Sequence, residues 1–301
     1  MRAVGERELL WLKQYGAPRY PRDPLYKAFY DGQKVDPKLQ ISFLEDYLKI
    51  APLMVPKQDN LNAPCFRHPD LSPNNIFVSE SGEITGVIDW QHATILPIFL
   101  QAKVPRHFQN YGDEDSENFR DPELPSNFKS MTQDEKQEEM ERYRRRQVHY
   151  FYIGFTSKLN KPHFHAMGKY HLVLRNQLFD IAGRPWEGDN TSLQAQLIKT
   201  LEHWADFDED GLPPPPIGYS ETDITSCLDR DSKQKSADAQ MEQIRGFIGV
   251  NIDGWVPLDT FDTAKEKSKI LKNEMLQSAE NEEERRDLLE NWPLQDHDEI
   301  D

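Results

Sequence analysis

Apolar residues recur at the spacing of helical turns through most of the chain, and this spacing predicts a mainly helical protein. The predicted helices cover residues 6–15, 37–50 and 132–160, one begins at 191, and two more cover about 221–248 and 258–290. Two of these starts carry capping signals. Asp36 stands directly before Pro37, and Thr132-x-x-Glu135 is a capping box.

The helix expected over 132–160 changes character along its length. Its first half is strongly charged, whereas its second half, around VHYFYIGF, is almost wholly apolar. A helix that is apolar all round is normally buried. We therefore expect the first half to project into solvent and the second half to be buried.

Between residues 66 and 90 the helical spacing gives way to short strand-like runs. Ile76-Phe77-Val78 and Ile84 to Ile88 are β-type runs, and the turn residues 79–83, with Gly82, separate them. This pattern predicts a β-hairpin. Together the predicted elements indicate an α+β fold that is predominantly α-helical and carries a small β-hairpin.

A proline run separates regions of different composition. Pro213 to Pro216 form a stiff, extended stretch and mark a candidate boundary. We expect one domain over 1–212, an additional helical region over 213–278 and an acidic tail over 279–301. The tail holds ten acidic residues against two arginines, so we expect it to be disordered.

The composition narrows the possible functions. The chain has 301 residues, with 36 Lys and Arg against 52 Asp and Glu, so its formal net charge is −16. Binding to nucleic acid or to an anionic membrane surface requires a basic excess, so both are disfavoured. Every apolar run is shorter than the roughly 20 residues of a membrane span, so we expect none. The two cysteines, Cys65 and Cys227, exclude a disulfide scaffold and a cysteine-rich zinc module.

One motif carries recognisable chemistry. His68-x-Asp70, followed by Asn75, has the spacing of a kinase catalytic loop. An aspartate such as Asp70 can accept or orient the proton of an attacking hydroxyl group, and the amide oxygen of Asn75 can bind a metal ion. Asp89 ends the second strand of the hairpin that Asn75 begins, so it can supply the second metal ligand. We expect His68 to brace the loop by hydrogen bonds.

The surroundings of the motif favour this interpretation. Leu71, Pro73, the strand 76–78 and the Ile88-Asp89-Trp90 ending all fit the same pattern. In the alternative interpretation Asp70 and Asn75 are turn formers and Asp89 caps a helix. Convergence of Asp70, Asn75 and Asp89 in space would distinguish the two.

The stretches HPDLSPNNIFV and GVIDW resemble the C-terminal lobe of the aminoglycoside/choline kinase-like phosphotransferases. The tryptophan after Asp89 is typical of that family. Longer stretches resemble one fungal subgroup, the altered-inheritance-of-mitochondria phosphotransferase-like proteins. These stretches are GVIDWQHATILPIFLQA, HFQNYGD, YRRRQVHYFY, PWEGDN and GWVP.

The resemblance implies a function as well as a fold. Residues 1–212 would form a kinase-like C-terminal lobe with its catalytic loop at 66–90. ATP and Mg²⁺ would be the cofactors, with Asp70 and His68 as catalytic residues and Asn75 and Asp89 as ligands of the metal and the nucleotide. The resemblance also implies a mitochondrial location. The N-terminus, MRAVGERELLWLKQYG, has no transit-peptide pattern, so a cytoplasmic location is the alternative.

The substrate would be a small molecule with a hydroxyl group. Related families that phosphorylate amines gather cationic substrates with acidic residues, so the acidic loop 113–123 can be read as a cation-binding segment. The alternative is a solvated loop. The oligomeric state is not predicted.

The chain departs from a complete kinase in one respect. Only 67 residues precede His68, and they show no glycine-rich loop and no strand lysine. We therefore expect the nucleotide lobe to be absent, through truncation, a partial gene model or a degenerate paralogue. Two hypotheses follow: a phosphotransferase that is incomplete or weakly active as this chain, and a non-catalytic, pseudokinase-like interaction module.

Overall fold

The computed structural model describes residues 1–22, 24–168, 170–250, 254–279 and 281–290, together with 292 and 294. The chain folds into two compact units that are interleaved along the sequence. Unit 1 comprises Met1–Pro52, Ile181–Glu202 and Pro215–Asp301, and unit 2 comprises Leu53–Asp180 and His203–Pro214. The described residues form helices and two small antiparallel sheets, so the fold is α+β and mostly helical, as the sequence predicts.

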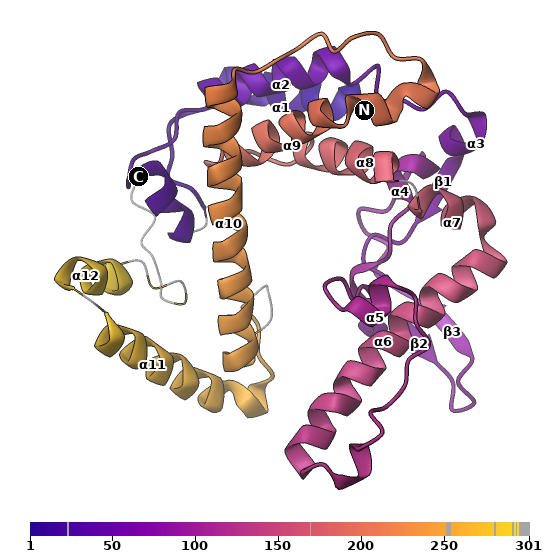
Figure 1. Cartoon of the computed structure of the whole chain (residues 1–301), viewed down its shortest axis with the longest axis vertical. Helices are drawn as coiled ribbons and strands as arrows, with labels where there is room; N and C mark the ends of the chain where they lie inside the picture. The colour runs from indigo at the N-terminus through magenta and orange to yellow at the C-terminus, as the bar shows by residue number, and fades with distance from the viewer. Residues whose placement is uncertain are drawn as a thin grey trace. The chain divides into compact units, whose positions relative to one another are not determined.

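Unit 1 is built from helices (Figure 1). They are α1 (Arg2–Tyr15), η1 (Pro24–Tyr30), α2 (Lys38–Ile50), α9 (Thr191–Glu202), α10 (Glu221–Ile248), η6 (Leu258–Thr260), α11 (Phe261–Ser278) and α12 (Glu282–Glu290). The helices predicted over 6–15, 37–50 and 221–248 are therefore confirmed. The stretch predicted as one helix over 258–290 is wrong in one respect, because α11 and α12 are separate helices.

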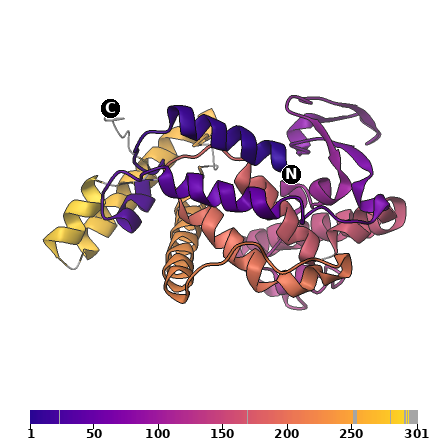
Figure 2. The same ribbon diagram turned by 90° about the horizontal axis from the view of Figure 1, so that it is seen from above.

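Helices α1 and α2 run side by side, as Figure 2 shows from above. Gly5 makes this close approach possible, because a Cβ atom there would lie 2.7 Å from the ring of Tyr47. The hydroxyl group of Tyr47, a residue with no exposed surface, donates to the carbonyl oxygen of Met1 at 2.7 Å. Burial of this ring and of Leu44 anchors the pair of helices.

A partly buried carboxylate fixes the start of α9. Asp189, two residues before the first residue of α9, accepts the backbone N–H groups of Thr191 at 2.9 Å and of Ser192 at 3.2 Å. Tyr30 and Gln234 also donate to Asp189, from η1 and α10. Burial alone would raise the pKa of Asp189, but these hydrogen bonds outweigh it and lower the pKa below its usual value.

Unit 2 contains the strands (Figure 1). Its elements are α3 (Asp59–Asn62), β1 (Pro64–Arg67), η2 (Pro73–Asn75), β2 (Ile76–Val78), β3 (Ile84–Val87), β4 (Thr94–Pro97), α4 (Ile98–Gln101), η3 (Arg106–Phe108), α5 (Glu114–Glu117), η4 (Phe128–Ser130), α6 (Gln133–Leu159), α7 (Lys161–Met167), α8 (Tyr170–Ala182) and η5 (Trp204–Asp210). Helix α8 reaches into unit 1 with its last two residues. Deeply buried apolar side chains of unit 2 include Met54, which precedes α3, and Phe99, Leu172, Leu178 and Phe207 on α4, α8 and η5.

The strands form two separate ladders. Strands β2 and β3 pair antiparallel, with Ile76 opposite Val87, so the predicted hairpin is confirmed. Strands β1 and β4 form a second antiparallel pair, with Arg67 opposite Thr94, which the sequence pattern does not reveal. The loop after β1 and the loop after β3 therefore lie in one region. The first loop begins where β1 ends, the second leads directly into β4, and β1 and β4 are paired.

The capping box at the start of α6 is present. Thr132 Oγ1 accepts the backbone N–H of Glu135, and Glu135 accepts the backbone N–H of Thr132 at 2.7 Å. The expected burial of the apolar second half is wrong. Among the residues of α6 only His149 is buried, whereas Phe155 is 59% and Leu159 is 82% exposed. Apolar residues on this helix line surfaces instead of a core.

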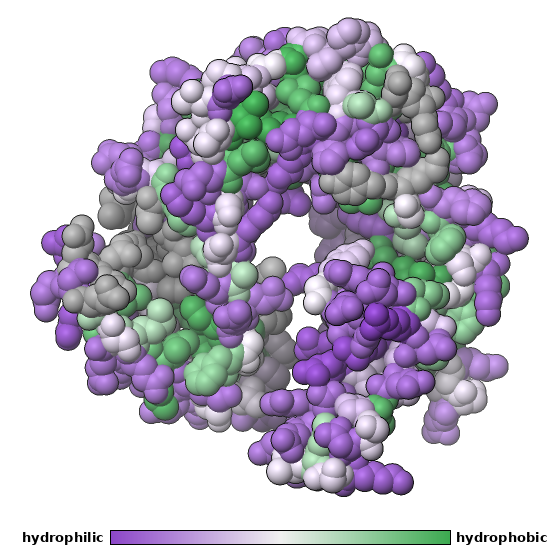
Figure 3. All heavy atoms as spheres, in the orientation of Figure 1, coloured by the Kyte–Doolittle hydropathy of each residue, from purple (hydrophilic) through white to green (hydrophobic). Residues whose placement is uncertain are grey.

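The face of the molecule in Figure 3 is mostly hydrophilic, with small apolar patches between hydrophilic areas. None of the described helices is both long enough and apolar enough to cross a membrane. The domains expected over 1–212 and 213–278 stay a prediction. Of the tail expected to be disordered, only 279, 281–290, 292 and 294 are described; the other positions lie outside the described residues.

Candidate active site

The candidate site is the loop between β1 and β2 together with the residues that follow β3. The chain leaves β1 at Arg67, and the next residue, His68, begins the loop that ends in the short helix η2. Asn75 closes η2 and is 9% exposed, whereas Asp70 and Asp89 are exposed to solvent. The site therefore has a buried amide at its base and two carboxylates at its surface.

His68 ties the loop to the end of β3. Its Nε2 atom lies 2.7 Å from the carbonyl oxygen of Ile88, and its Nδ1 atom accepts the backbone N–H of Asp70 at 3.2 Å. A carbonyl oxygen can only accept, so Nε2 carries the hydrogen and Nδ1 supplies the lone pair. Both ring nitrogens are thereby engaged with the backbone, as expected for a bracing residue.

Asn75 holds the other end of the loop. Its Nδ2 atom donates to the backbone oxygen of Asp70 at 2.9 Å and to the carboxylate Oδ2 of Asp70 at 3.3 Å. The backbone oxygen of Asn75 accepts the N–H of Ile88 at 3.0 Å. Because Nδ2 makes these bonds, the amide oxygen Oδ1 is the atom of this side chain that suits a cation.

Asp89 follows Ile88, and Ile88 is bonded to both His68 and Asn75. The structure therefore brings the ring of His68 and the backbone of Asn75 to Ile88, directly before Asp89. Asp89 has φ = 61°, in the left-handed region, where aspartate is one of the tolerated residues. Asp89 lies two residues after the last residue of β3, so this conformation changes the direction of the chain just beyond the strand.

Aromatic rings border the site on one side. The ring of Trp90 stacks on Phe66 with centroids 5.1 Å apart, and it meets the edge of the His68 ring at 4.6 Å. The indole N–H of Trp90 donates to the carbonyl oxygen of Val87 at 2.9 Å. These contacts restrict the orientation of His68 and hence of the loop that it braces.

A second brace lies behind β1, and no pattern in the sequence predicts it. The guanidinium group of Arg67 donates to the carbonyl oxygens of Gln101 and Lys103, and to the hydroxyl of Tyr152 on α6 at 2.8 Å. Burial lowers the pKa of Arg67, and the neighbouring Tyr152 opposes that shift. A single arginine has no pattern that would mark it as a brace, which is why sequence reasoning missed it.

His163 on α7 adds a buried base near this brace. The side chain is 4% exposed, and its Nε2 atom has no hydrogen-bond partner among the described residues. Burial and the positive charge of Arg67 lower the pKa of His163 to about 4. The imidazole is therefore neutral at physiological pH and adds no charge next to Arg67.

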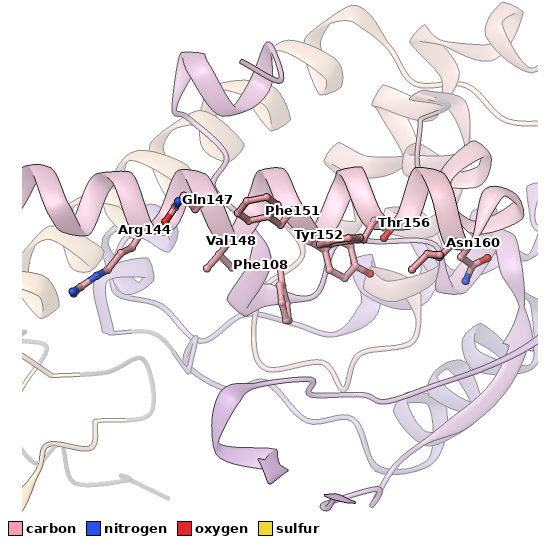
Figure 4. A pocket seen from close by; sticks show the side chains of 10 residues that line it. Phe108, Arg144, Gln147, Val148, Phe151, Tyr152, Thr156 and Asn160 are labelled. Atoms are coloured by element: carbon pink, nitrogen blue, oxygen red, sulfur yellow. The ribbon is translucent and has the colours of Figure 1, made fainter. Parts of the chain in front are cut away.

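Tyr152 also lines an open pocket of about 620 Å³ on α6 (Figure 4). Tyr152 and Val148 line it from α6, and Phe108 lies opposite with its ring centroid 5.0 Å from that of Tyr152. Phe151, Phe155 and Leu159 extend the apolar lining along the helix. This surface is where most of the exposed apolar residues of α6 are found.

The donor set at the site suits a hard cation only in part. Asp89 offers carboxylate oxygens and Asn75 an amide oxygen, both of the type that Mg²⁺ prefers. Within the described ranges no group of three or more His, Cys, Asp or Glu side chains could hold a metal ion. These residues fit Mg²⁺ that is also bound by phosphate oxygens and water, as is usual for this ion.

One protein family matches the part of the chain that carries the candidate site. Residues 11–99 match the phosphotransferase enzyme family known as APH. The matched stretch includes the whole candidate site, from His68 to Trp90. No solved structure matches the chain significantly.

Fungal relatives are similar over much more of the chain. A subtelomeric hrmA-associated cluster protein of Aspergillus fumigatus is 27% identical over 297 residues, which is 98% of this chain and 57% of that protein. The mitochondrial altered inheritance of mitochondria protein 9 of Kluyveromyces lactis is 25% identical over 248 residues, covering 79% of this chain and 38% of the relative. The protein of the same name from Saccharomyces cerevisiae S288c is 24% identical over 247 residues, with the same coverage.

The chain thus spans about half of the first of these relatives and less of the yeast proteins. The match to the phosphotransferase family and the similarity to the altered-inheritance-of-mitochondria proteins agree with the stretches quoted above from the sequence. The resemblance is therefore confirmed: over residues 11–99 the chain is similar to the APH phosphotransferase family, and over most of its length to the fungal altered inheritance of mitochondria protein 9.

Proposed function

We propose that this chain carries the acceptor and metal side of an ATP-dependent phosphotransferase that transfers the γ-phosphate to a substrate hydroxyl group. The observation that supports this most is the bonding of His68 and Asn75 to the same residue, Ile88, directly before Asp89. This arrangement fits a kinase-like C-terminal lobe.

Asp70 would orient the attacking hydroxyl and accept its proton. Its carboxylate is exposed, and the hydrogen bond from Asn75 fixes its position at the end of the loop. His68 would act on Asp70 through the backbone, because both of its ring nitrogens are engaged there. In this proposal His68 is a positioning residue.

Asn75 and Asp89 would hold Mg²⁺ together with the phosphate oxygens of ATP. Bound there, the ion would neutralise charge on the transferred phosphate group. This chain would supply the amide oxygen of Asn75 and the carboxylate of Asp89. The two residues are linked through Ile88, which is bonded to Asn75 and directly precedes Asp89. Two protein ligands leave the rest of the coordination shell to phosphate and water.

We expect this chain by itself to bind MgATP weakly and to turn over little. The described residues before β1 form helices and one isolated bridge between Arg19 and Val35, rather than a β-rich lobe. Phosphoryl transfer depends on positioning and on charge stabilisation from both sides of the nucleotide. The site described above supplies one of those sides.

Calorimetric titration of the full chain with MgATP tests this proposal. We expect binding in the millimolar range that Asp89→Ala weakens at least fivefold. The matched control is Glu80→Ala, which removes an exposed carboxylate at the far end of the same hairpin. Equal affinity of the wild type and Asp89→Ala would contradict the assigned role. Micromolar binding that Asp89→Ala abolishes would support the role but overturn the expectation of weak binding.

A non-catalytic interaction module is the second candidate. The observation that favours it is the exposed apolar surface of α6, where Phe151 is 49% and Phe155 is 59% exposed. Apolar side chains spaced along one helix suit a partner helix. Failure to detect any metal or nucleotide binding that depends on Asp89 would favour this candidate.

The substrate would be a small molecule with a hydroxyl group. A cationic substrate is a secondary option, because several carboxylates of the acidic loop 113–123 already form ion pairs within the protein. Arg146 binds Asp113 at 2.7 Å and Asp115 at 2.7 Å. Burial alone would raise the pKa of Asp113, but the bonds from Arg146 and Ser116 lower it.

A mitochondrial location is part of the same proposal. It is supported by the mitochondrial proteins to which this chain is similar. Fractionation of cells that express the chain with a C-terminal tag would test it, and the cytoplasm is the alternative location.

A further inference from the structure

A cavity of about 670 Å³ lies within unit 2, apart from the residues of the candidate active site. Three helices contribute one face each to its wall. His149, Ile153 and Ser157 are spaced four residues apart on α6, while Phe164 and Met167 come from α7 and Val173, Asn176 and Asp180 from α8. The residues around Val104 and Phe119 complete the lining. The volume is in the usual range for small-molecule sites.

Two buried polar side chains each donate a hydrogen bond to a backbone carbonyl oxygen with one atom and leave a second polar atom at the cavity wall. His149, 7% exposed, donates from Nδ1 to the carbonyl oxygen of Phe108 at 2.8 Å, so Nε2 keeps a lone pair. Asn176, 8% exposed, donates from Nδ2 to the carbonyl oxygen of Leu100 at 2.8 Å, so Oδ1 remains an acceptor. Neither Nε2 nor Oδ1 bonds to a described residue, and neither is sealed from solvent.

Ser157 adds a third acceptor on the same side. Its hydroxyl hydrogen is used in a bond to the carbonyl oxygen of Gly154 at 2.8 Å, so Oγ can only accept from a ligand. These three polar groups of the cavity wall, on His149, Asn176 and Ser157, therefore present lone pairs. A ligand that supplies hydrogen-bond donors would satisfy them, and an apolar body would cover the remaining wall.

The charged groups at the cavity do not select a charged ligand. Lys103 and Asp180 pair with each other at 3.4 Å. Glu117 is exposed and accepts the backbone N–H of Gly112 at 2.8 Å. Solvent screening weakens the field of such exposed groups, so the buried acceptor atoms decide the choice of ligand.

We propose that this cavity binds a neutral, apolar small molecule, of the size of one or two fused rings, that carries a hydroxyl or N–H donor. The donor would bind His149 Nε2 or Asn176 Oδ1, and the rings would pack against Ile153, Phe164 and Met167. This site is separate from the proposed phosphotransferase activity and does not depend on it.

Binding of 2-naphthol to the full chain, measured by calorimetry, tests the proposal. The probe 2-methoxynaphthalene has the same rings but no donor. One hydrogen bond contributes about 1 kcal/mol, so we expect 2-naphthol to bind roughly fivefold tighter. Equal affinities, or no binding of 2-naphthol up to its solubility limit, would overturn the proposal.

Two matched substitutions locate the binding. Val173→Trp fills the cavity from α8 at a position that is 37% exposed, and we expect it to weaken 2-naphthol binding at least tenfold. Val148→Trp makes the same change at a position that is 43% exposed, in the open pocket of Figure 4, and should leave binding unchanged. The opposite pattern would place the ligand on the outer surface of α6 and contradict the proposal.

A measurement on the wild-type chain locates the ligand without depending on whether the variants fold. In methyl NMR spectra, 2-naphthol should shift the resonances of Ile153 and Met167 and leave those of Val148 and Leu159 in place. Shifts confined to Val148 and Leu159 would overturn the assignment of the site.

Discussion

The Nε2 atom of His68 donates a hydrogen bond to the carbonyl oxygen of Ile88 at 2.7 Å, which fixes the loop carrying Asp70 to the strand end that precedes Asp89. The two residues are twenty positions apart in the sequence. This bond and the bond from the N–H of Ile88 to the backbone oxygen of Asn75 give the candidate site its shape.

Replacement of His68 by alanine should loosen this loop. The variant loses the bonds to Ile88 and to Asp70 and the ring contact with Trp90, so we expect the free energy of unfolding to fall by about 1–3 kcal/mol. Amide hydrogen exchange at Asp70 should also accelerate. The control is His107→Ala, at an exposed position in η3, which should change neither quantity. Unchanged exchange at Asp70 in His68→Ala would show that the loop does not need this brace.

The buried His163 should make stability depend on pH. Its folded-state pKa of about 4 lies below the usual value of 6.5, so the unfolded chain binds a proton more readily. The contribution of His163 to the free energy of unfolding is therefore fully present above pH 6.5. It should be lost as the pH decreases toward 4, which lowers the free energy of unfolding by on the order of 2 kcal/mol.

Urea unfolding at pH 7 and pH 5 measures this effect. The decrease in unfolding free energy between the two values should be smaller in His163→Gln than in the wild type. His165→Gln, at an exposed position of the same helix, should retain the full decrease. An equal decrease in all three proteins would show that His163 does not titrate as its burial requires.

The capping box of α6 should contribute measurably to stability. Thr132→Ala removes the acceptor for the N–H of Glu135, and loss of such a cap costs about 1 kcal/mol. Denaturant unfolding of this variant should show a lower midpoint with an unchanged slope. Gln133→Ala, at the next and exposed position, should stay within about 0.5 kcal/mol of the wild type.

Features that depend on neighbouring residues could be predicted from the sequence. The hairpin was found because two β-type runs and a turn with Gly82 follow one another within a dozen residues. The α6 capping box was found because its two partners lie three positions apart. In both cases the interacting groups are local, so spacing alone identifies them.

Contacts between distant segments could not be predicted in this way. The pairing of β1 with β4 and the brace from Arg67 to Tyr152 join residues that no periodic pattern links. The prediction that the second half of α6 is buried was wrong for a related reason. Periodicity shows which residues share a face, but whether another element covers Phe155 or Leu159 depends on the tertiary fold.

The proposed roles of the site residues came from the motif, and the structure adds how they are held. The spacing of His68, Asp70 and Asn75 pointed to a kinase-like loop. It did not reveal that Ile88 contacts both His68 and Asn75, because that contact needs the β3 end to return to the loop. The metal-binding role of Asn75 and Asp89 stays a prediction.

The most direct test of the account is paramagnetic broadening by Mn²⁺ in the presence of ATP. Manganese accepts the same oxygen ligands as magnesium and broadens the NMR signals of nuclei near it. In the wild-type chain we expect Mn²⁺ with ATP to broaden the backbone amide signals of Asn75, Ile88 and Asp89 selectively. Asp89→Ala should abolish this effect, and Glu80→Ala should retain it. Equal broadening in wild type and Asp89→Ala, or broadening centred on the turn around Glu80, would contradict a metal site at Asn75 and Asp89.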